Sequence, residues 1–225
     1  MNLHSKRKNT TEVVQLTFNP FQENTYLLYD DTKQGVIIDP GCLDVSEKQE
    51  LARTIQALGV TPVRLLNTHC HLDHVFGNRF VAEKYHLSLE IHSGEISMLE
   101  RAPQAAMLYG VPYPELSPAP GAFIEDGDII EFGNTRLEAI LTPGHSPASL
   151  SFFCAESNFL IAGDVLFYGS IGRTDLPGGD YDTLIESIVN RLLPLGDNVT
   201  VYSGHGQATT IGFEKQHNPF LIDVR

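Results

Sequence analysis

The sequence predicts an α+β fold in which helices cover a mixed β-sheet. Short apolar runs of strand length recur along the chain, residues typical of turns separate them, and single stretches with helical spacing interrupt them. With 225 residues, 42% of them hydrophobic and 19% charged, the chain can build a sizeable core and does not resemble a disordered segment. We therefore expect one domain over residues 1–225, in which residues 1–12 form a flexible tail.

The first half of the chain alternates between expected strands and expected helices. Apolar runs predict strands over residues 13–18, 24–29, 35–38, 63–67 and 87–91. A helix is expected over residues 46–58, because Leu51, Ile55 and Leu58 recur at helical spacing and Gly59 follows them. A second helix is expected over residues 75–85.

The second half is richer in strands and contains one ambiguous segment. Strands are expected over residues 128–132, 136–141, 149–153, 159–162 and 199–202, with a helix over residues 181–193. Residues 101–121 hold five of the 13 prolines and predict an irregular segment. Two interpretations stay open for it: a linker, or a loop that packs on the domain or contacts substrate.

Composition narrows the classes of partner and the cellular location. There are 15 Lys and Arg residues against 28 Asp and Glu, so the formal net charge of −13 argues against binding to nucleic acid or to an anionic membrane. The three cysteines do not make a disulfide framework. No apolar segment follows the basic residues 6–8 and no run approaches the roughly 18 apolar residues of a membrane span, so we expect a cytoplasmic protein.

Five of the nine histidines lie in patterns typical of a metal site. The string Thr-His-Cys-His-Leu-Asp-His at residues 68–74 follows an apolar strand, and its imidazoles and carboxylate suit zinc, iron or manganese. In an extended segment His69, His71 and Asp73 face one side, whereas His74 faces differently and can serve a second metal. Cys70 alternates with these residues and is expected to point away from the metals, as a small core residue.

Three further polar residues follow apolar strands and have glycine neighbours. They are His145, Asp164 and His205. Together with the first string they make five histidines and two aspartates, which is enough for two metals with a bridging group. Asp39 follows a buried strand and either orients a ligand imidazole or forms an Asx-turn. A site that only staples the fold is a further alternative, although structural zinc sites are usually rich in cysteine.

These strings carry a family resemblance. Thr-His-x-His-x-Asp-His followed in order by Pro-Gly-His, Gly-Asp and Gly-His-Gly resembles the metallo-β-lactamase fold superfamily over residues 18–220. Residues 169–180 and 217–220 resemble the glyoxalase II-like hydrolases, particularly their small single-domain branch. The secreted β-lactamases usually have Cys where this chain has Asp164, and flavodiiron oxidoreductases usually have Glu in place of His71, so the pattern favours neither group.

The resemblance implies an αββα sandwich of two mixed β-sheets with helices on the outer faces. It further implies two divalent metal ions. Zinc is the expected metal, and iron and manganese are the alternatives. One ion would be bound by His69, His71 and His145, the other by Asp73, His74 and His205, with Asp164 as the bridge. A water held between two such ions loses a proton near neutral pH and attacks a carbonyl carbon. Asp73 and Asp164 are the expected catalytic residues.

The expected activity is hydrolysis of a small-molecule thioester, of the hydroxyacylglutathione hydrolase type. Tyr168 and Arg173 are candidates for contacting the substrate, although Arg173 can instead fix its loop through Asp175 or Asp180. Full-length glyoxalase II enzymes hold glutathione with a helical extension that residues 206–225 do not match. The resemblance therefore indicates the reaction, thioester hydrolysis, more strongly than it indicates glutathione as the thiol carrier. The alternative is a mononuclear iron persulfide dioxygenase of the same fold, in which a similar histidine string occurs.

Overall fold

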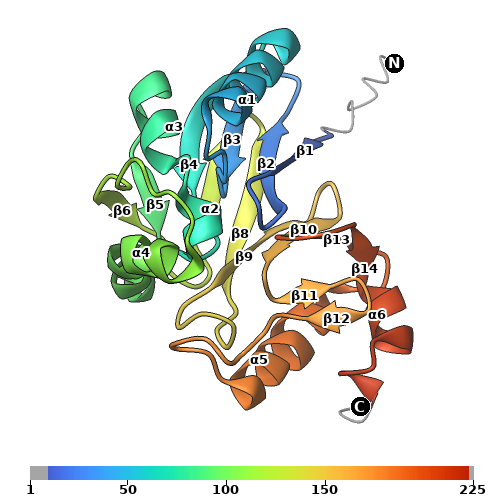
Figure 1. The fold of residues 1–225 in the computed structure, drawn as a ribbon. Coiled ribbons are helices and arrows are strands. Elements are labelled where there is room, and N and C mark those ends of the chain that lie inside the picture. Colours follow the sequence, from blue (N-terminus) through green and yellow to red (C-terminus); the bar gives the residue numbers. More distant parts are fainter. Residues whose placement is uncertain (1–9, 223–225) are drawn as a thin grey trace, which may run out of the picture.

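The computed structural model describes residues 10–222 and contains two six-stranded mixed sheets (Figure 1). Residues 1–9 of the expected tail lie outside the described residues. The tail prediction is wrong for its last residues, because Thr11 is buried and Glu12 begins the first strand. The Thr11 backbone donates a hydrogen bond to Ser157 Oγ at 3.0 Å, and its hydroxyl lies 3.0 Å from that of Thr135.

The first sheet holds its strands in sequence order. These strands are β1 (Glu12–Phe18), β2 (Glu23–Tyr29), β3 (Gln34–Ile38), β4 (Thr61–Leu66), β5 (Leu89–Ile91) and β6 (Pro120–Phe123). Strands β1 to β3 pair antiparallel and β3 to β6 pair parallel. The parallel connections pass through helices, as is usual for crossovers between parallel strands.

The second sheet has the order β14-β13-β10-β9-β8-β7. Its strands are β7 (Ile129–Phe132), β8 (Thr135–Leu141), β9 (Leu150–Cys154), β10 (Phe159–Gly163), β13 (Thr200–Ser203) and β14 (Thr209–Thr210). Only β10 and β13 pair parallel. A small separate hairpin, β11 (Leu166–Phe167) and β12 (Ser170–Ile171), follows β10.

Alternate residues of the central strands pack into different apolar layers. In β2, Tyr26 and Leu28 pack between the two sheets, whereas Leu27 packs toward the helices outside the first sheet. In β10, Ile161 packs between the sheets and Leu160 packs outside the second sheet. Both faces of these strands are therefore buried, which explains the continuous apolar runs of residues 26–29 in β2 and 159–162 in β10.

Helices cover both outer faces (Figure 1), which confirms the expected sandwich of two mixed sheets. The outer face of the first sheet packs against α1 (Val45–Leu58), α3 (Asn78–Tyr85) and α4 (Ile96–Tyr109). The outer face of the second packs against α5 (Tyr181–Ser187) and α6 (Ile211–His217). Helix α1 begins with a capping box between Asp44 and Glu47 and ends at Gly59 in a left-handed conformation, as its sequence predicts.

Helix α4 contradicts the expectation of an irregular segment over residues 101–121. Residues 96–109 are helical although Pro103 lies inside the helix. Proline removes one backbone donor from a helix interior. Here Met98, Ala102 and Ala106 are buried against the first sheet, and this tertiary packing outweighs the local preference.

The other departures are short elements. The expected helix over residues 75–85 is split into α2 (Leu72–Val75) and α3, and α5 continues through a π-helical turn at Ile188–Leu192 and a 3-10 turn at Leu193–Leu195. Strands β6, β11, β12 and β14 and helix α6 were not expected from the sequence, since each is too short to show periodicity. Within residues 10–222 no helix is long and apolar enough to cross a membrane.

We predict that Tyr26 joins the two sheets through its hydroxyl group. Tyr26 lies on β2 and donates a hydrogen bond of 2.6 Å to the carbonyl oxygen of Ser203, on β13 of the other sheet. Tyr26→Phe should lower the free energy of unfolding by about 0.5–1.5 kcal/mol, the usual net value of a hydrogen bond. Urea denaturation at equal metal content measures this change.

Tyr29→Phe is the matched control. Tyr29 lies on the same strand, and its hydroxyl makes no hydrogen bond to any residue that the structure describes. Its loss should leave stability within about 0.5 kcal/mol of the parent protein. Equal effects of the two substitutions would contradict a bond between the sheets.

Candidate metal centre

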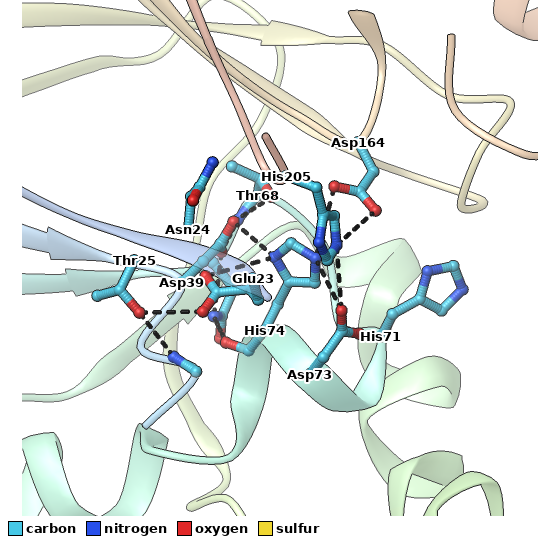
Figure 2. Close-up of polar contacts among 12 residues, drawn as sticks. Glu23, Asn24, Thr25, Asp39, Thr68, His71, Asp73, His74, Asp164 and His205 are labelled. Atoms are coloured by element: carbon cyan, nitrogen blue, oxygen red, sulfur yellow. Dashed lines mark hydrogen bonds and ion pairs between the residues drawn. The ribbon is translucent and has the colours of Figure 1, made fainter. Parts of the chain in front are cut away.

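The residues expected to bind metal lie together where strands of both sheets end. Figure 2 shows His71, Asp73, His74, Asp164 and His205 of this cluster. His69, His71, Asp73 and His74 follow β4 of the first sheet. The other three follow strands of the second sheet: His145 comes after β8, Asp164 after β10 and His205 after β13. The edges of two sheets therefore build one cluster, as expected for side chains beyond the carboxyl ends of strands.

Three sets of side chains are close enough to share a cation: one is Asp39 with His69 and His74, and the other two consist of expected ligands with one aspartate between them. In one group the ligand atoms of His69, His71 and His145 all lie within 4.8 Å of one another. The same holds for the second group, which consists of Asp73, His74 and His205.

Asp164 contacts members of both groups. Its Oδ2 lies 3.5 Å from Nε2 of His145 and 3.5 Å from Nε2 of His205, and its Oδ1 lies 3.5 Å from Nε2 of His74. A carboxylate placed in this way can bridge two cations, each held by one of the histidine groups.

Several polar atoms of the cluster have no protein partner, which tests whether metals fit. Nε2 of His69, Nε2 of His74 and Oδ1 of Asp164 are buried and make no hydrogen bond to the described residues. Each such atom costs about 1–3 kcal/mol if nothing replaces the water that it lost. Nδ1 of His71 lies only 2.8 Å from Nε2 of His145, so their two lone pairs require a proton or a cation between them. The arrangement fits divalent metal ions.

Outer hydrogen bonds fix the tautomer of four histidines. In each of them Nδ1 lies within hydrogen-bonding distance of an oxygen, and Nε2 is left as the atom that faces the cluster. The pairs are His69 with Thr68 Oγ1 (3.0 Å), His74 with Asp39 Oδ2 (3.2 Å), His145 with the Arg173 carbonyl (2.8 Å) and His205 with the Phe21 carbonyl (3.1 Å).

Asp39 is the centre of the hydrogen bonds behind the metal ligands (Figure 2). Its carboxylate accepts from Nδ1 of His74, from the Thr68 backbone at 2.7 Å, from the Thr68 hydroxyl at 2.6 Å and from Nδ2 of Asn67 at 3.2 Å. Of the two interpretations left open for Asp39, these contacts support the one in which it orients a ligand imidazole. Its φ of 50° is in the left-handed region that aspartate tolerates better than most residues.

Sequence reasoning missed Glu95, which ties the two ligand-bearing loops together. Glu95 is 1% exposed and precedes helix α4. Its carboxylate accepts from the Cys70 backbone at 2.9 Å, from the Ala148 backbone at 2.9 Å and from the Ser146 hydroxyl. It therefore links the string of residues 68–74 to the loop of His145. No spacing pattern in the sequence predicts such a contact. Cys70 itself is fully buried.

The start of β2 also supports the site without a sequence signal. Asn24 Nδ2 donates to the carbonyls of Ser203 (3.0 Å) and Gly206 (2.9 Å), which flank His205. Glu23 is fully buried, and this burial raises the pKa of its carboxyl well above the usual value. Burial therefore favours the protonated, uncharged form of Glu23 beside the cluster.

Glycine is required where one of these loops approaches Asp164. A Cβ atom on Gly204 would lie 2.0 Å from Oδ1 of Asp164 and 2.9 Å from Cε1 of His74. No side chain fits there, so the glycine before His205 is a steric requirement of the cluster.

The protonation of the cluster is divided between its members. Burial lowers the pKa of His71 to about 3 and that of His69 well below its usual value, so both are neutral. Burial opposes a proton on His205 as well, but Asp164 and Asp73 raise the pKa of His205 to about 9. Burial likewise opposes the charge of Asp164, yet His74 and His205 hold its pKa well below the usual value. A cation bound at these nitrogens would therefore compete with the protons that the neighbouring carboxylates favour on His74 and His205.

The cluster lies in the wall of a cavity of about 950 Å³. Tyr168 and Arg173 line this cavity, as their expected role requires. Arg173 also forms a two-bond ion pair with Asp175, at 2.7 and 2.8 Å, so the loop-fixing contact is present too. Asp180 has another role and caps helix α5. Contact of Tyr168 and Arg173 with substrate stays a prediction.

Comparison with known proteins identifies the family. The family model described as "Metallo-beta-lactamase superfamily" matches residues 18–205. The chain belongs to this superfamily. Hydroxyacylglutathione hydrolase GloC of Haemophilus influenzae is 39% identical over 93% of this chain and 97% of its own length. The probable metallo-hydrolase YqgX of Bacillus subtilis is 38% identical over 92% of this chain and 96% of its own length.

Solved structures of the superfamily share the fold. The BLEG-1 B3 metallo-beta-lactamase superposes with a TM-score of 0.86 at 37% identity and covers 94% of this chain and 100% of its own. TTHA1623 in a di-iron-bound form superposes with a TM-score of 0.84 at 38% identity and covers 93% of this chain and 100% of its own. ETHE1 from Myxococcus xanthus superposes with a TM-score of 0.74 at 25% identity and covers 92% of this chain and 83% of its own. The chain is thus a superfamily hydrolase with His and Asp groups able to bind metal.

We predict that Asp39 sets the metal affinity of the group formed by Asp73, His74 and His205. Asp39→Asn keeps the size of the side chain but leaves one acceptor oxygen for donors on three residues, Asn67, Thr68 and His74. Metal affinity should fall about 10- to 100-fold, as is typical when the partner of a ligand histidine is lost. Competition with a chromophoric chelator measures it.

Asp182→Asn is the control for this loss. Asp182 is an exposed residue in the first turn of α5, and its substitution should leave the affinity unchanged. If Asp39→Asn retains parental affinity while circular dichroism shows a native fold, Asp39 does not orient the ligand.

Proposed function

We propose that the protein is a dinuclear metal-dependent thioesterase that hydrolyses small thioesters of the hydroxyacylglutathione type. The observation that carries the proposal is that two ligand groups, joined by Asp164, open into one cavity large enough for a small-molecule substrate. The relative named hydroxyacylglutathione hydrolase is similar over 97% of its length and supports the choice of a thioester.

The donor set suits zinc, with iron and manganese as alternatives. All seven side chains offer imidazole nitrogen or carboxylate oxygen, and no cysteine belongs to either group. We place one ion with His69, His71 and His145, the second with Asp73, His74 and His205, and Asp164 between them. When bound, such ions supply a water that ionises near neutral pH and polarise a carbonyl oxygen.

Asp73 is suited to take a proton from the attacking water. Its Oδ2 lies 3.2 Å from Nε2 of His205 and 3.6 Å from Nε2 of His74. Burial opposes its charge, but His74 and His205 keep the pKa of Asp73 below the usual value, so it is a carboxylate at neutral pH. The network behind His74 and the backbone contacts of His205 hold both rings in place, so the carboxylate keeps its position.

Two arginines make the cavity suitable for an anionic substrate. Arg101 and Arg173 both line it, and the only carboxylates among its described lining residues are Asp73 and Asp164. The charge of Arg173 is matched by Asp175, whereas Arg101 forms no ion pair within residues 10–222. Arg101 is therefore the better candidate to bind a carboxylate of the thiol carrier, and Arg173 is a second candidate.

We predict that Asp164 is required for thioester hydrolysis. The metal-loaded protein should hydrolyse S-lactoylglutathione, and Asp164→Ala should lower kcat/KM at least ~100-fold, because both groups lose their shared carboxylate. Loss of thioester absorbance and metal content are measured together. Asp182→Ala, on the surface of α5, is the control and should retain activity.

Two outcomes would reject this function. Complete unfolding of Asp164→Ala would indicate metals that only staple the fold. One iron per chain together with persulfide-dependent oxygen consumption, and no hydrolysis of any thioester, would establish the dioxygenase of the same fold instead.

We predict that Arg101 recognises the charge of the carrier. Arg101→Gln should raise KM for S-lactoylglutathione about three- to tenfold with little change in kcat, which corresponds to about 0.7–1.4 kcal/mol of binding. KM for the uncharged carrier in S-lactoyl-N-acetylcysteamine should not change. Arg53→Gln on α1, outside the cavity, is the matched control. Equal effects on both carriers would contradict a role in binding charge.

A further inference from the structure

Beyond the metal ligands, the cavity wall is mainly apolar, and this points to the acyl group of the substrate. We propose that the protein prefers thioesters with an apolar acyl group, aliphatic and several carbons long or aromatic, and that α4 supplies the wall that binds it. This inference rests on the proposed thioesterase function. It concerns the selectivity of the site and assigns a role to the helix that the sequence did not predict.

One wall of the cavity is a face of α4. Met98, Ala102, Ala105 and Tyr109 recur at helical spacing along it, and Leu108 extends the face toward solvent. Met98 and Ala102 are buried against the first sheet, so this wall is anchored to the core. The two alanines leave space where larger side chains would fill the cavity.

The facing wall comes from the β11–β12 hairpin and is held by stacked rings. Phe167, Tyr168 and Ile171 line the cavity from this side. The Tyr168 ring stacks on Phe213 of α6 at a centroid distance of 4.7 Å, and Phe213 stacks on His217 at 4.5 Å. Tyr168 is thereby fixed as a flat apolar surface, which suits a chain or a ring.

Several of these apolar side chains are open to water. Leu108 is 88% exposed, Tyr109 50% and Tyr168 49%. A ligand that covers them gains from the burial of apolar surface, by up to about fourfold in affinity for each methylene group. A lactoyl group is short and carries a hydroxyl, so it would contact only a small part of this apolar wall. A longer apolar acyl group would contact the whole wall and cover its exposed apolar side chains.

Exposed apolar residues can also mark a protein interface, but these converge on one cavity. Leu108 and Tyr109 line the same cavity as Asp73 and His145, two members of the metal cluster. Met107, on the same helix and 81% exposed, does not line it. The arrangement therefore favours a bound small molecule over a flat docking surface.

The first test measures binding without hydrolysis. S-hexylglutathione and S-methylglutathione are titrated calorimetrically into the metal-loaded protein, since neither can be hydrolysed. We expect the hexyl compound to bind at least tenfold more tightly. Ala105→Phe, which fills the cavity, and Leu108→Asn, at an exposed position where we expect little effect on stability, should each reduce this ratio at least threefold. Met107→Phe is the control on the same helix and should keep the parental ratio.

The second test follows hydrolysis along an acyl series on one carrier. From acetyl- to hexanoylglutathione, kcat/KM should rise at least tenfold in the parent protein, and Ala105→Phe should flatten the rise. Equal or better hydrolysis of the short acyl groups, or equal binding of the two thioethers, would overturn the acyl preference. If the hexyl compound binds selectively but no thioester is hydrolysed, the apolar site stands and the proposed reaction fails.

Discussion

The convergence of five imidazoles and two carboxylates, most of them buried, at one edge of the sandwich is the constraint on which the rest of the structure depends. Groups of this kind are stable only when each nitrogen and oxygen has a partner. On the outer side, protein oxygens supply the partners of four histidines. On the inner side, several atoms face one another with no such partner in residues 10–222, and cations are the partners that suit them.

The supporting groups come from distant parts of the chain because the cluster joins two sheets. Asp39 follows β3 and holds the segment after β4, while Asn24 on β2 holds the loop after β13. Glu95, at the start of α4, binds two ligand-bearing loops at once. The same helix then supplies the apolar wall of the cavity. Helix α4 thus contacts the loops of the cluster through its N-cap residue and lines the cavity along one face.

Most of the fold was predictable from the sequence because its strands are buried on both faces. The runs around Leu27, Ile37 and Ile161 are apolar without interruption, and such runs are strong strand signals. Helix α4 was not predictable, since Pro103 and its neighbours indicate a loop until the first sheet packs against Met98 and Ala106. Short strands such as β11 and β14 exist only through pairing with a partner strand, which no local pattern reveals.

The sequence by itself determined the chemistry: which residues carry imidazole and carboxylate groups, and that each group follows an apolar strand, three of them beside a glycine. The spacing of residues 69–74 is local, so it could be interpreted without coordinates. Only the tertiary structure decided how the groups divide around Asp164, which residues support them, and what the cavity can hold. These properties arise from contacts between residues far apart in the chain, such as Glu95 with Cys70 and Ala148, and side-chain type alone does not specify them.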